Sequence, residues 1–227
     1  MPTETAKPEL EHAFDKYVSA RAHVINNGYE PEIDWQASRN VSRIDEQEFL
    51  REAAWVILNG GMRESVVRTK FPAISSAFYD FESSLTIVEN RRRCVERGIA
   101  SFNHPKKLEA IVGVACRIAL EGFETVKGAT TRYGSSFLRS FDYIGPVTSK
   151  HLAKNLGVAE SKPDRHLQRI AEALQFSDVA TLCSELSNLS GDSVPVVDVV
   201  MWRFATLRRD YQDWFGRNSK RPVADCF

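Results

Sequence analysis

Apolar residues recur at the three- and four-residue spacing of an α-helix along most of the chain, whereas alternating, strand-like patterns are scarce. In segment 46–59, for example, the apolar stripe runs from Phe49 to Ile57, and the helix is expected to stop at Gly60-Gly61. We therefore expect an all-α protein of about ten helices. The expected helices span 46–59, 62–70, 73–82 (opened by Pro72), 84–98, 105–122, 123–129, 131–140, 146–156, 163–175, 177–189 and 194–216.

The longest stretch without a periodic pattern is 26–44, and we expect a loop there. Long loops inside compact domains are often functional, so this one enters the search for a site. The pattern suggests three parts: an N-terminal extension (1–45) that packs beside the C-terminal helices, a helical core (46–216) and a frayed tail (217–227).

Composition limits the class of protein. A chain of 227 residues, 43% of them hydrophobic, suits one large domain or two small lobes. No apolar run approaches the ~18 residues that a membrane span needs, and the polar, acidic N-terminus does not resemble a targeting peptide. We therefore expect a cytoplasmic protein without a membrane partner. Zinc and iron–sulfur sites need closely spaced thiolates, so we expect no metal from the four scattered cysteines: Cys94, Cys116, Cys183 and Cys226.

The charge balance is neutral overall but uneven along the chain. Thirty basic residues match thirty acidic ones, and this argues mildly against a nucleic-acid partner. Residues 1–50 are rich in acidic side chains, however, so basic residues elsewhere can still form a basic face. The basic clusters are Arg91–Arg93 (interpreted as a solvated surface), Lys106–Lys107, Lys150–Lys154 and Arg203–Arg209.

Segment 140–172 carries two features with chemical meaning. Ile144-Gly145-Pro146 separates two helical segments and places Thr148 in the first turn of the second, where unpaired backbone N–H groups suit a phosphate. Downstream, Pro163 fits the first position of the next helix, so Asp164 is expected near that helix's N-terminus.

Together these features resemble the helix-hairpin-helix/GPD superfamily of base-excision DNA glycosylases. The superfamily's hairpin motif lies over about 138–157, where Ile144-Gly145-Pro146 and Thr148 agree with its consensus. Its Pro/Val-Asp-x-His-x-x-Arg-Val/Ile string matches residues 163–170, and the two motifs have the expected separation. The resemblance implies a two-lobed, all-α glycosylase fold that acts on double-stranded DNA as a monomer without a cofactor.

The resemblance also implies roles for particular residues. Asp164 would be the catalytic carboxylate, and His166 would support its loop. Residues 59–63 would be a loop that enters the DNA beside the flipped base, with Met62 as an apolar wedge. The implied DNA-binding residues are Met62, Arg63, Ile144, Gly145, Val147, Thr148 and Lys150. His151 and Trp202 would line the base pocket, while Trp35, in the acidic stretch outside the resemblance, is a further candidate for stacking on a base.

Two positions depart from the superfamily pattern. Tyr143 replaces the first hairpin glycine, so the turn cannot freely adopt a positive φ there. Val147 stands where bifunctional members carry a Schiff-base lysine, so we expect base removal without strand cleavage. Alkylated, oxidised, deaminated and hypermodified phage bases all remain candidate substrates, and the last would suit a role in antiviral defence.

Two alternative functions, and alternative roles for several of these residues, stay open at this point. The chain could be a non-catalytic DNA-binding protein that keeps the hairpin for phosphate contact, or a lyase that uses a lysine from elsewhere. Asp164 could simply cap a helix, His151 could be solvated, Trp202 could be a core residue, and the stretch around Trp35 could be a solvated acidic loop.

Overall fold

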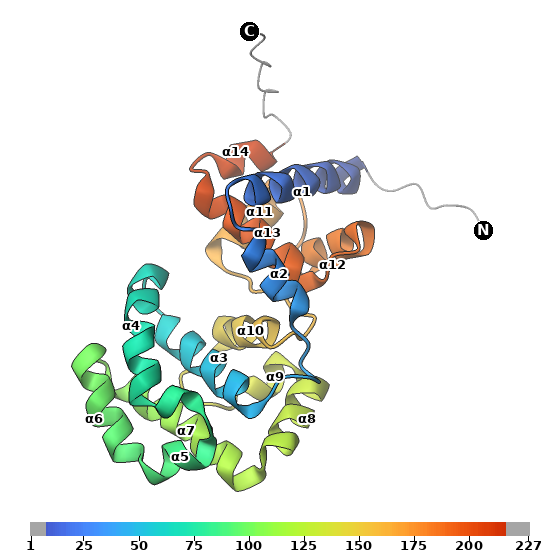
Figure 1. The fold of residues 1–227 in the computed structure, drawn as a ribbon. Helices are drawn as coiled ribbons and strands as arrows, with labels where there is room; N and C mark the ends of the chain where they lie inside the picture. Colours follow the sequence, from blue (N-terminus) through green and yellow to red (C-terminus); the bar gives the residue numbers. More distant parts are fainter. Residues whose placement is uncertain (1–7, 217–227) are drawn as a thin grey trace. The chain divides into compact units, whose positions relative to one another are not determined.

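The computed structural model describes residues 8–216, and this range contains fourteen α-helices, one short 3-10 helix and no β-strand. The all-α prediction is confirmed (Figure 1). The expected tail 217–227 lies outside the described residues. The elements are α1 (Pro8–Asn26), α2 (Glu30–Ser38), α3 (Glu46–Asn59), α4 (Glu64–Ala77), η1 (Tyr79–Phe81), α5 (Ser84–Glu89), α6 (Arg91–Ser101), α7 (Pro105–Glu121), α8 (Phe123–Tyr133), α9 (Ser135–Leu138), α10 (Pro146–Asn155), α11 (Arg165–Ala173), α12 (Val179–Ser190), α13 (Val194–Leu207) and α14 (Tyr211–Phe215).

The chain divides into two compact units. The central unit comprises residues 39–160, and the terminal unit combines residues from both ends of the chain, 8–38 and 161–216. Each unit has a hydrophobic core of its own. The hairpin segment belongs to the central unit, while Asp164 belongs to the terminal unit.

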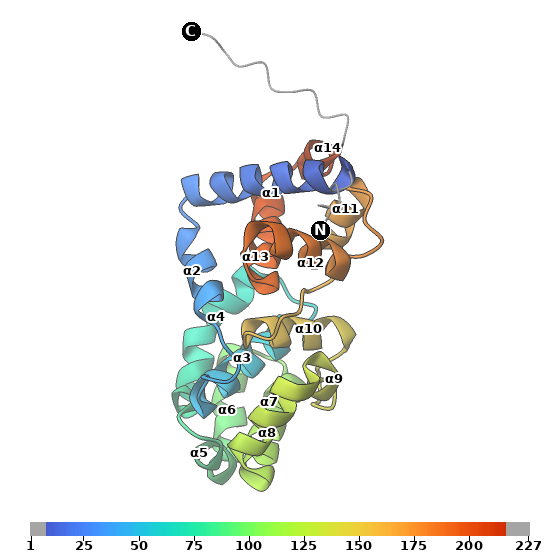
Figure 2. The same ribbon diagram turned by 90° about the vertical axis from the view of Figure 1, so that its right-hand side faces the viewer.

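The central unit is organised around α7, which packs against α3, α5, α6 and α8. One face of α7 is apolar, and Leu108, Ile111 and Ala115 are buried along it. Helix α10 packs against α3 and α9, so the turn that precedes α10 is supported from within the same core (Figure 2).

The terminal unit is centred on α13. Helices α1, α2, α11 and α12 all pack against it, which joins the first and last parts of the chain. Phe204 lies at the middle of this core, with its ring centroid 4.4 Å from that of Trp214 and 5.3 Å from that of Phe215. Aromatic contacts of this kind add to the free energy gained from burying apolar area.

The prediction of a loop over residues 26–44 is wrong for residues 30–38, which form helix α2. Only Ile33 and Gln36 of this helix are buried, so its sequence shows almost no apolar periodicity. Helix α1 was also not foreseen. Alanines occupy two of its four buried positions and weaken the apolar stripe, which consists of Ala13, Tyr17, Ala20 and Val24.

Pro72 does not open a helix as expected. It lies inside α4, which continues to Ala77 because Val67, Phe71 and Ile74 keep one apolar stripe on the core across the proline. Two expected helices are instead interrupted. Segment 84–98 breaks at Asn90, between α5 and α6, and segment 194–216 breaks after Leu207.

Gly157 is a position where the fold demands glycine. Its φ is +87°, and a Cβ atom there would lie 2.6 Å from the backbone of Arg39 and Asn40.

We expect Gly157→Ala to lower the free energy of unfolding by about 2 kcal/mol or more, because backbone strain and a clash with the neighbouring backbone add up. Chemical denaturation measures this. The control is Gly113→Ala in α7, where a Cβ meets nothing within 4 Å and a gain of about 0.5–1 kcal/mol is expected. Equal stability of the two variants would contradict the packing described.

Candidate functional site

The hairpin consists of α9, a turn over residues 139–145 and α10. Gly145 precedes α10, and its N–H donates to Thr148 Oγ1 at 2.7 Å, while Ser149 N–H donates back to the Gly145 carbonyl at 2.8 Å. Gly145 has no side chain, so it cannot cap the first-turn amides of α10, those of Val147 and Thr148. The predicted helix N-terminus is therefore present, and its N–H groups suit an anion.

Tyr143 adopts the left-handed conformation that the turn requires, with φ of +62°. The sequence predicts that a tyrosine cannot adopt a positive φ freely here, and Tyr143 nevertheless adopts it. The turn keeps its shape at a cost of roughly 1–2 kcal/mol of backbone strain. The Tyr143 ring is 44% exposed and meets His104 edge-on, with 5.9 Å between centroids.

The predicted DNA-contact loop connects α3 to α4 in the same unit. Asn59 ends α3, Gly61 has φ of +72°, and Arg63 precedes α4. Met62 is 41% exposed at this turn, and Arg63 is also exposed. An exposed methionine between two helices has the position that a wedge needs.

The loop and the hairpin lie side by side, although they are far apart in the sequence. A Cβ on Gly60 would lie 3.8 Å from Thr148 Cγ2 and 3.8 Å from Lys107 Nζ. Lys107 is 3% exposed and donates to the carbonyls of Leu58 at 2.7 Å and Gly60 at 2.5 Å. We call the surface formed by residues 59–63, His104, Tyr143 and residues 145–148 the hairpin face. Lys107 lies buried beneath it, and Ile144, a predicted DNA-binding residue, is 4% exposed and belongs to the core. Val147 is 41% exposed on the hairpin face, and Lys150 and His151 follow, half-buried, on α10.

Asp164 is the N-cap residue of α11, so that helix begins two residues later than expected and Pro163 lies before it. Asp164 Oδ1 accepts hydrogen bonds from His166 N–H at 2.9 Å and Leu167 N–H at 3.1 Å. Its Oδ2 lies 3.8 Å from Lys162 Nζ, and the side chain is 16% exposed. The carboxylate therefore does cap a helix, and the cap also fixes its orientation.

The segment that carries Asp164 is anchored on both sides. Lys162 N–H donates at 2.6 Å to Asp198 Oδ2, a buried carboxylate on α13. His166 Nδ1 lies 3.1 Å from the Tyr211 hydroxyl on α14. His166 thus contacts Asp164 through its backbone N–H, while its ring joins α11 to α14.

The three pocket candidates are divided between the units. Trp35 on α2 is 38% exposed, and Trp202 on α13 is half-buried; both belong to the terminal unit, whereas His151 belongs to the central unit. The Arg203 guanidinium lies 4.7 Å from the centre of the Trp202 ring and makes two hydrogen bonds with Glu32 on α2, at 2.8 and 2.5 Å. This bridge fixes the helix that carries Trp35.

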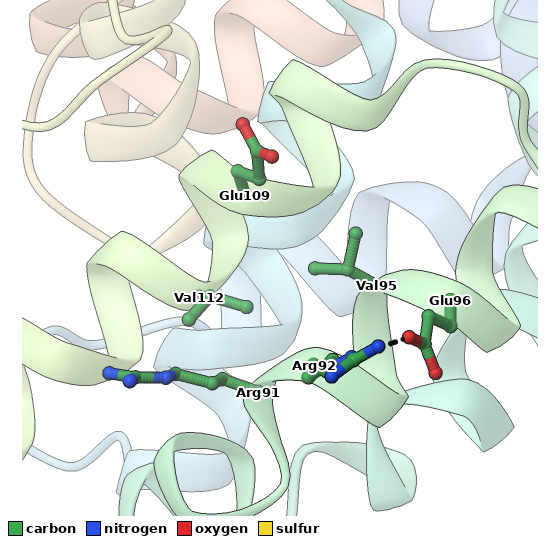
Figure 3. Close-up of a pocket in the computed structure, with 6 residues that line it drawn as sticks. All are labelled: Arg91, Arg92, Val95, Glu96, Glu109 and Val112. Carbon is green, nitrogen blue, oxygen red and sulfur yellow. Dashed lines mark hydrogen bonds and ion pairs between the residues drawn. The ribbon is translucent and has the colours of Figure 1, made fainter.

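A hollow of about 320 Å³ lies elsewhere on the central unit, between α6 and α7 (Figure 3). Charges of both signs line it, and Arg92 pairs with Glu96 at 2.8 Å. None of the predicted site residues contributes to it. Its lining residues are Arg91, Arg92, Val95, Glu96, Glu109 and Val112.

Comparison with known proteins found no family model, curated protein or solved structure that matches this chain. Over residues 8–216, no three histidine, cysteine, aspartate or glutamate side chains are grouped so that they could hold a metal ion. None of the helices in that range is long and apolar enough to span a bilayer.

Sequence reasoning missed three residues that shape the site: Lys107, Asp198 and Tyr211. Lys107 resembles an ordinary solvated residue in a basic pair, and nothing in the sequence shows that it is buried. Asp198 lies in the apolar run of α13, and a carboxylate there is a signal that could have been used, since buried charges need partners.

Burial lowers the pKa of His166 below its ordinary value, against the opposing effect of Asp164, with smaller lowering contributions from Arg165, Arg169 and Lys162. Between the folded and unfolded pKa values the unfolded chain binds more protons. The stabilising contribution is therefore complete above about pH 6.5 and is lost as the pH falls through that value toward the folded pKa.

We expect His166→Asn to show a smaller drop in thermal stability than the wild type between about pH 7.5 and pH 5.5, because the variant has no imidazole to protonate. Thermal unfolding at the two pH values measures the difference. The assignment would be contradicted if both proteins lost the same amount of stability on acidification.

Proposed function

We propose that the protein is a monofunctional DNA glycosylase that flips a damaged or modified base and hydrolyses its N-glycosidic bond with Asp164, leaving an abasic site. The observation that supports this most strongly is the hairpin face. The wedge loop (59–63), which the resemblance implies, and the phosphate-binding turn before α10 lie against each other in the fold at Gly60 and Thr148.

The hairpin face has the parts needed to hold a duplex with one base removed from the stack. The N-terminal amides of α10 would bind a backbone phosphate, which fixes the position of the DNA without reading its sequence. Met62 would enter the stack beside the extruded nucleotide, and Arg63 would contact the orphaned partner base or a phosphate. The target nucleotide must leave the stack because C1′ is shielded inside duplex DNA.

Asp164 would act on the sugar of the extruded nucleotide. As the bond from C1′ to the base nitrogen breaks, positive charge develops on the deoxyribose, as in glycoside hydrolysis. A fixed carboxylate stabilises that charge and accepts a proton from the attacking water. The water oxygen bonds to C1′, and the base leaves with the bonding electron pair and takes a proton from solvent, while Asp164 releases to solvent the proton that it accepted. The two cap hydrogen bonds to Oδ1 keep the carboxylate from rotating away.

Val147 limits the proposal to base removal. It is exposed at the first turn of α10, and a valine cannot form a Schiff base with C1′. The Schiff-base route to strand cleavage is therefore not proposed. The hairpin face does not indicate which class of base is removed. Trp35, held on α2 by the Glu32–Arg203 bridge, is the candidate residue for stacking on it, and hypermodified bases of foreign DNA stay among the candidate substrates.

The central test compares Asp164→Asn with Asp178→Asn. Asparagine caps helices about as well as aspartate, so both variants should fold normally. Asp178 is a matched control because it is the N-cap of α12 in the same unit and accepts a hydrogen bond from Thr181 N–H at 2.8 Å. We expect base release to fall by at least about 100-fold in Asp164→Asn, the lower end for loss of a positioned acid–base group, and to stay unchanged in Asp178→Asn. Mass spectrometry of bases released from a panel of damaged and modified duplexes measures this.

Equal release by wild type and Asp164→Asn would remove Asp164 from the mechanism. A covalent complex trapped by borohydride with the wild type would contradict the monofunctional assignment. Absence of release from every duplex, with binding retained, would favour the second candidate, a non-catalytic helix-hairpin-helix protein. The capping role of Asp164 is the observation that favours that candidate.

A further inference from the structure

Lys107 occupies an electrostatically costly position. It is the third residue of α7, where a positive charge opposes the helix dipole, and its side chain is 3% exposed. Burial also lowers the pKa of its ammonium group. Among residues 8–216, no carboxylate forms an ion pair with it. A buried cation without a carboxylate partner needs strong hydrogen bonds to offset the loss of water.

Those hydrogen bonds all come from the end of α3 and the start of the loop that follows it. Lys107 Nζ donates to the carbonyl of Leu58, in the last turn of α3, and to that of Gly60, the first loop residue. Carbonyls at a helix C-terminus lack intrahelical partners and carry partial negative charge, so a cation is favourable there. The ammonium group thus joins the first turn of α7 to the loop.

The same contacts link the loop to the hairpin. The Gly60 Cβ position is 3.8 Å from both Lys107 Nζ and Thr148 Cγ2, and the ring of His104, the N-cap residue of α7, meets the Tyr143 ring edge-on. Lys107 therefore lies beneath the place where loop and hairpin meet. Its charge also offsets the partial negative charge of the α3 terminus, which would otherwise repel a nearby phosphate.

We propose that Lys107 is a positioning residue, which fixes loop 59–63 beside the hairpin so that Met62 can enter a nucleic-acid duplex at an unstacked position. The inference rests on the proposed function and adds a residue to it. Lys107 does not contact the ligand. It acts through the carbonyls of Leu58 and Gly60, and the ligand is duplex DNA with a disrupted base stack.

The test compares Lys107→Met with Lys106→Met in the full chain. Lys106 is the exposed neighbour on the same helix, so the control removes the same charge without touching the loop. Amide hydrogen exchange over residues 58–63 reports loop order without reference to function. Affinity is measured for a duplex with a tetrahydrofuran abasic analogue and for the corresponding single strand, which has no stack to enter.

We expect Lys107→Met to speed exchange over 58–63 and to weaken abasic-duplex binding by about tenfold, a loss of about 1.4 kcal/mol, without changing single-strand binding. Met62→Ala should also weaken binding to the abasic duplex but not to the single strand, with normal amide exchange outside residues 58–63. Lys106→Met should leave loop exchange and the ratio of duplex to single-strand affinity unchanged. If Lys107→Met does not fold, Lys107→Gln, which keeps an amide NH2 donor but no charge, takes its place.

Unchanged exchange in Lys107→Met would overturn the proposal. Equal weakening on duplex and single strand, or an equal effect of Lys106→Met, would also overturn it, because a general loss of stability or charge predicts those results. In each of these cases the wild type still binds the abasic duplex, so the proposed function survives. Absence of wild-type binding to the abasic duplex would overturn both.

Discussion

The fold depends on one close backbone approach inside the central unit. The chain enters this unit at Arg39 and leaves it after Glu160, and Gly157 lies directly against the backbone of Arg39. The Arg39 guanidinium donates to the Asn155 carbonyl at 3.3 Å and to Glu48 at 2.7 Å. Because entry and exit are held together, both ends of the chain are available to build one terminal unit around α13.

A largely buried carboxylate also contacts both sides of this junction. Glu52 on α3 accepts a hydrogen bond from Asn155 Nδ2 at 2.9 Å, and its Oε1 lies 3.8 Å from an Arg39 nitrogen. Burial raises the pKa of Glu52, although Asn155 and Arg39 both favour its charged form. Helix α10 runs from this junction back to the hairpin, so the interactions that hold entry and exit together also orient the hairpin face on the core.

Much of this organisation could be predicted from local sequence patterns. The bounds of α3 were predicted residue for residue, since a strong apolar stripe ends at the glycine pair Gly60-Gly61. The hairpin turn and the place of Asp164 at a helix start also followed from proline and glycine positions. What failed depends on tertiary contacts. Pro72 stays inside a helix because the core retains the residues around it, and α2 forms on α13 with little amphipathic pattern of its own.

The same division applies to the candidate site. Residue types and spacing indicated the hairpin turn and the helix start at Asp164, because each is a contiguous motif, and the resemblance to the superfamily implied the loop at 59–63. Lys107 could not be found in this way, since its role arises from contacts with residues about fifty positions earlier in the chain. Tyr143 was visible in the sequence as a departure from the motif, but the turn keeps its shape even though a tyrosine disfavours the positive φ at that position.

The central claim is that the hairpin face and Asp164 act on the same stretch of DNA, although they belong to different units. Amide hydrogen exchange of the wild type, with and without a duplex that carries a tetrahydrofuran abasic analogue, tests it most directly. The account predicts protection over 59–63 and 143–149 in the central unit together with 163–167 in the terminal unit. Protection confined to the central unit would contradict it and would identify the hairpin face as a binding surface without a catalytic partner.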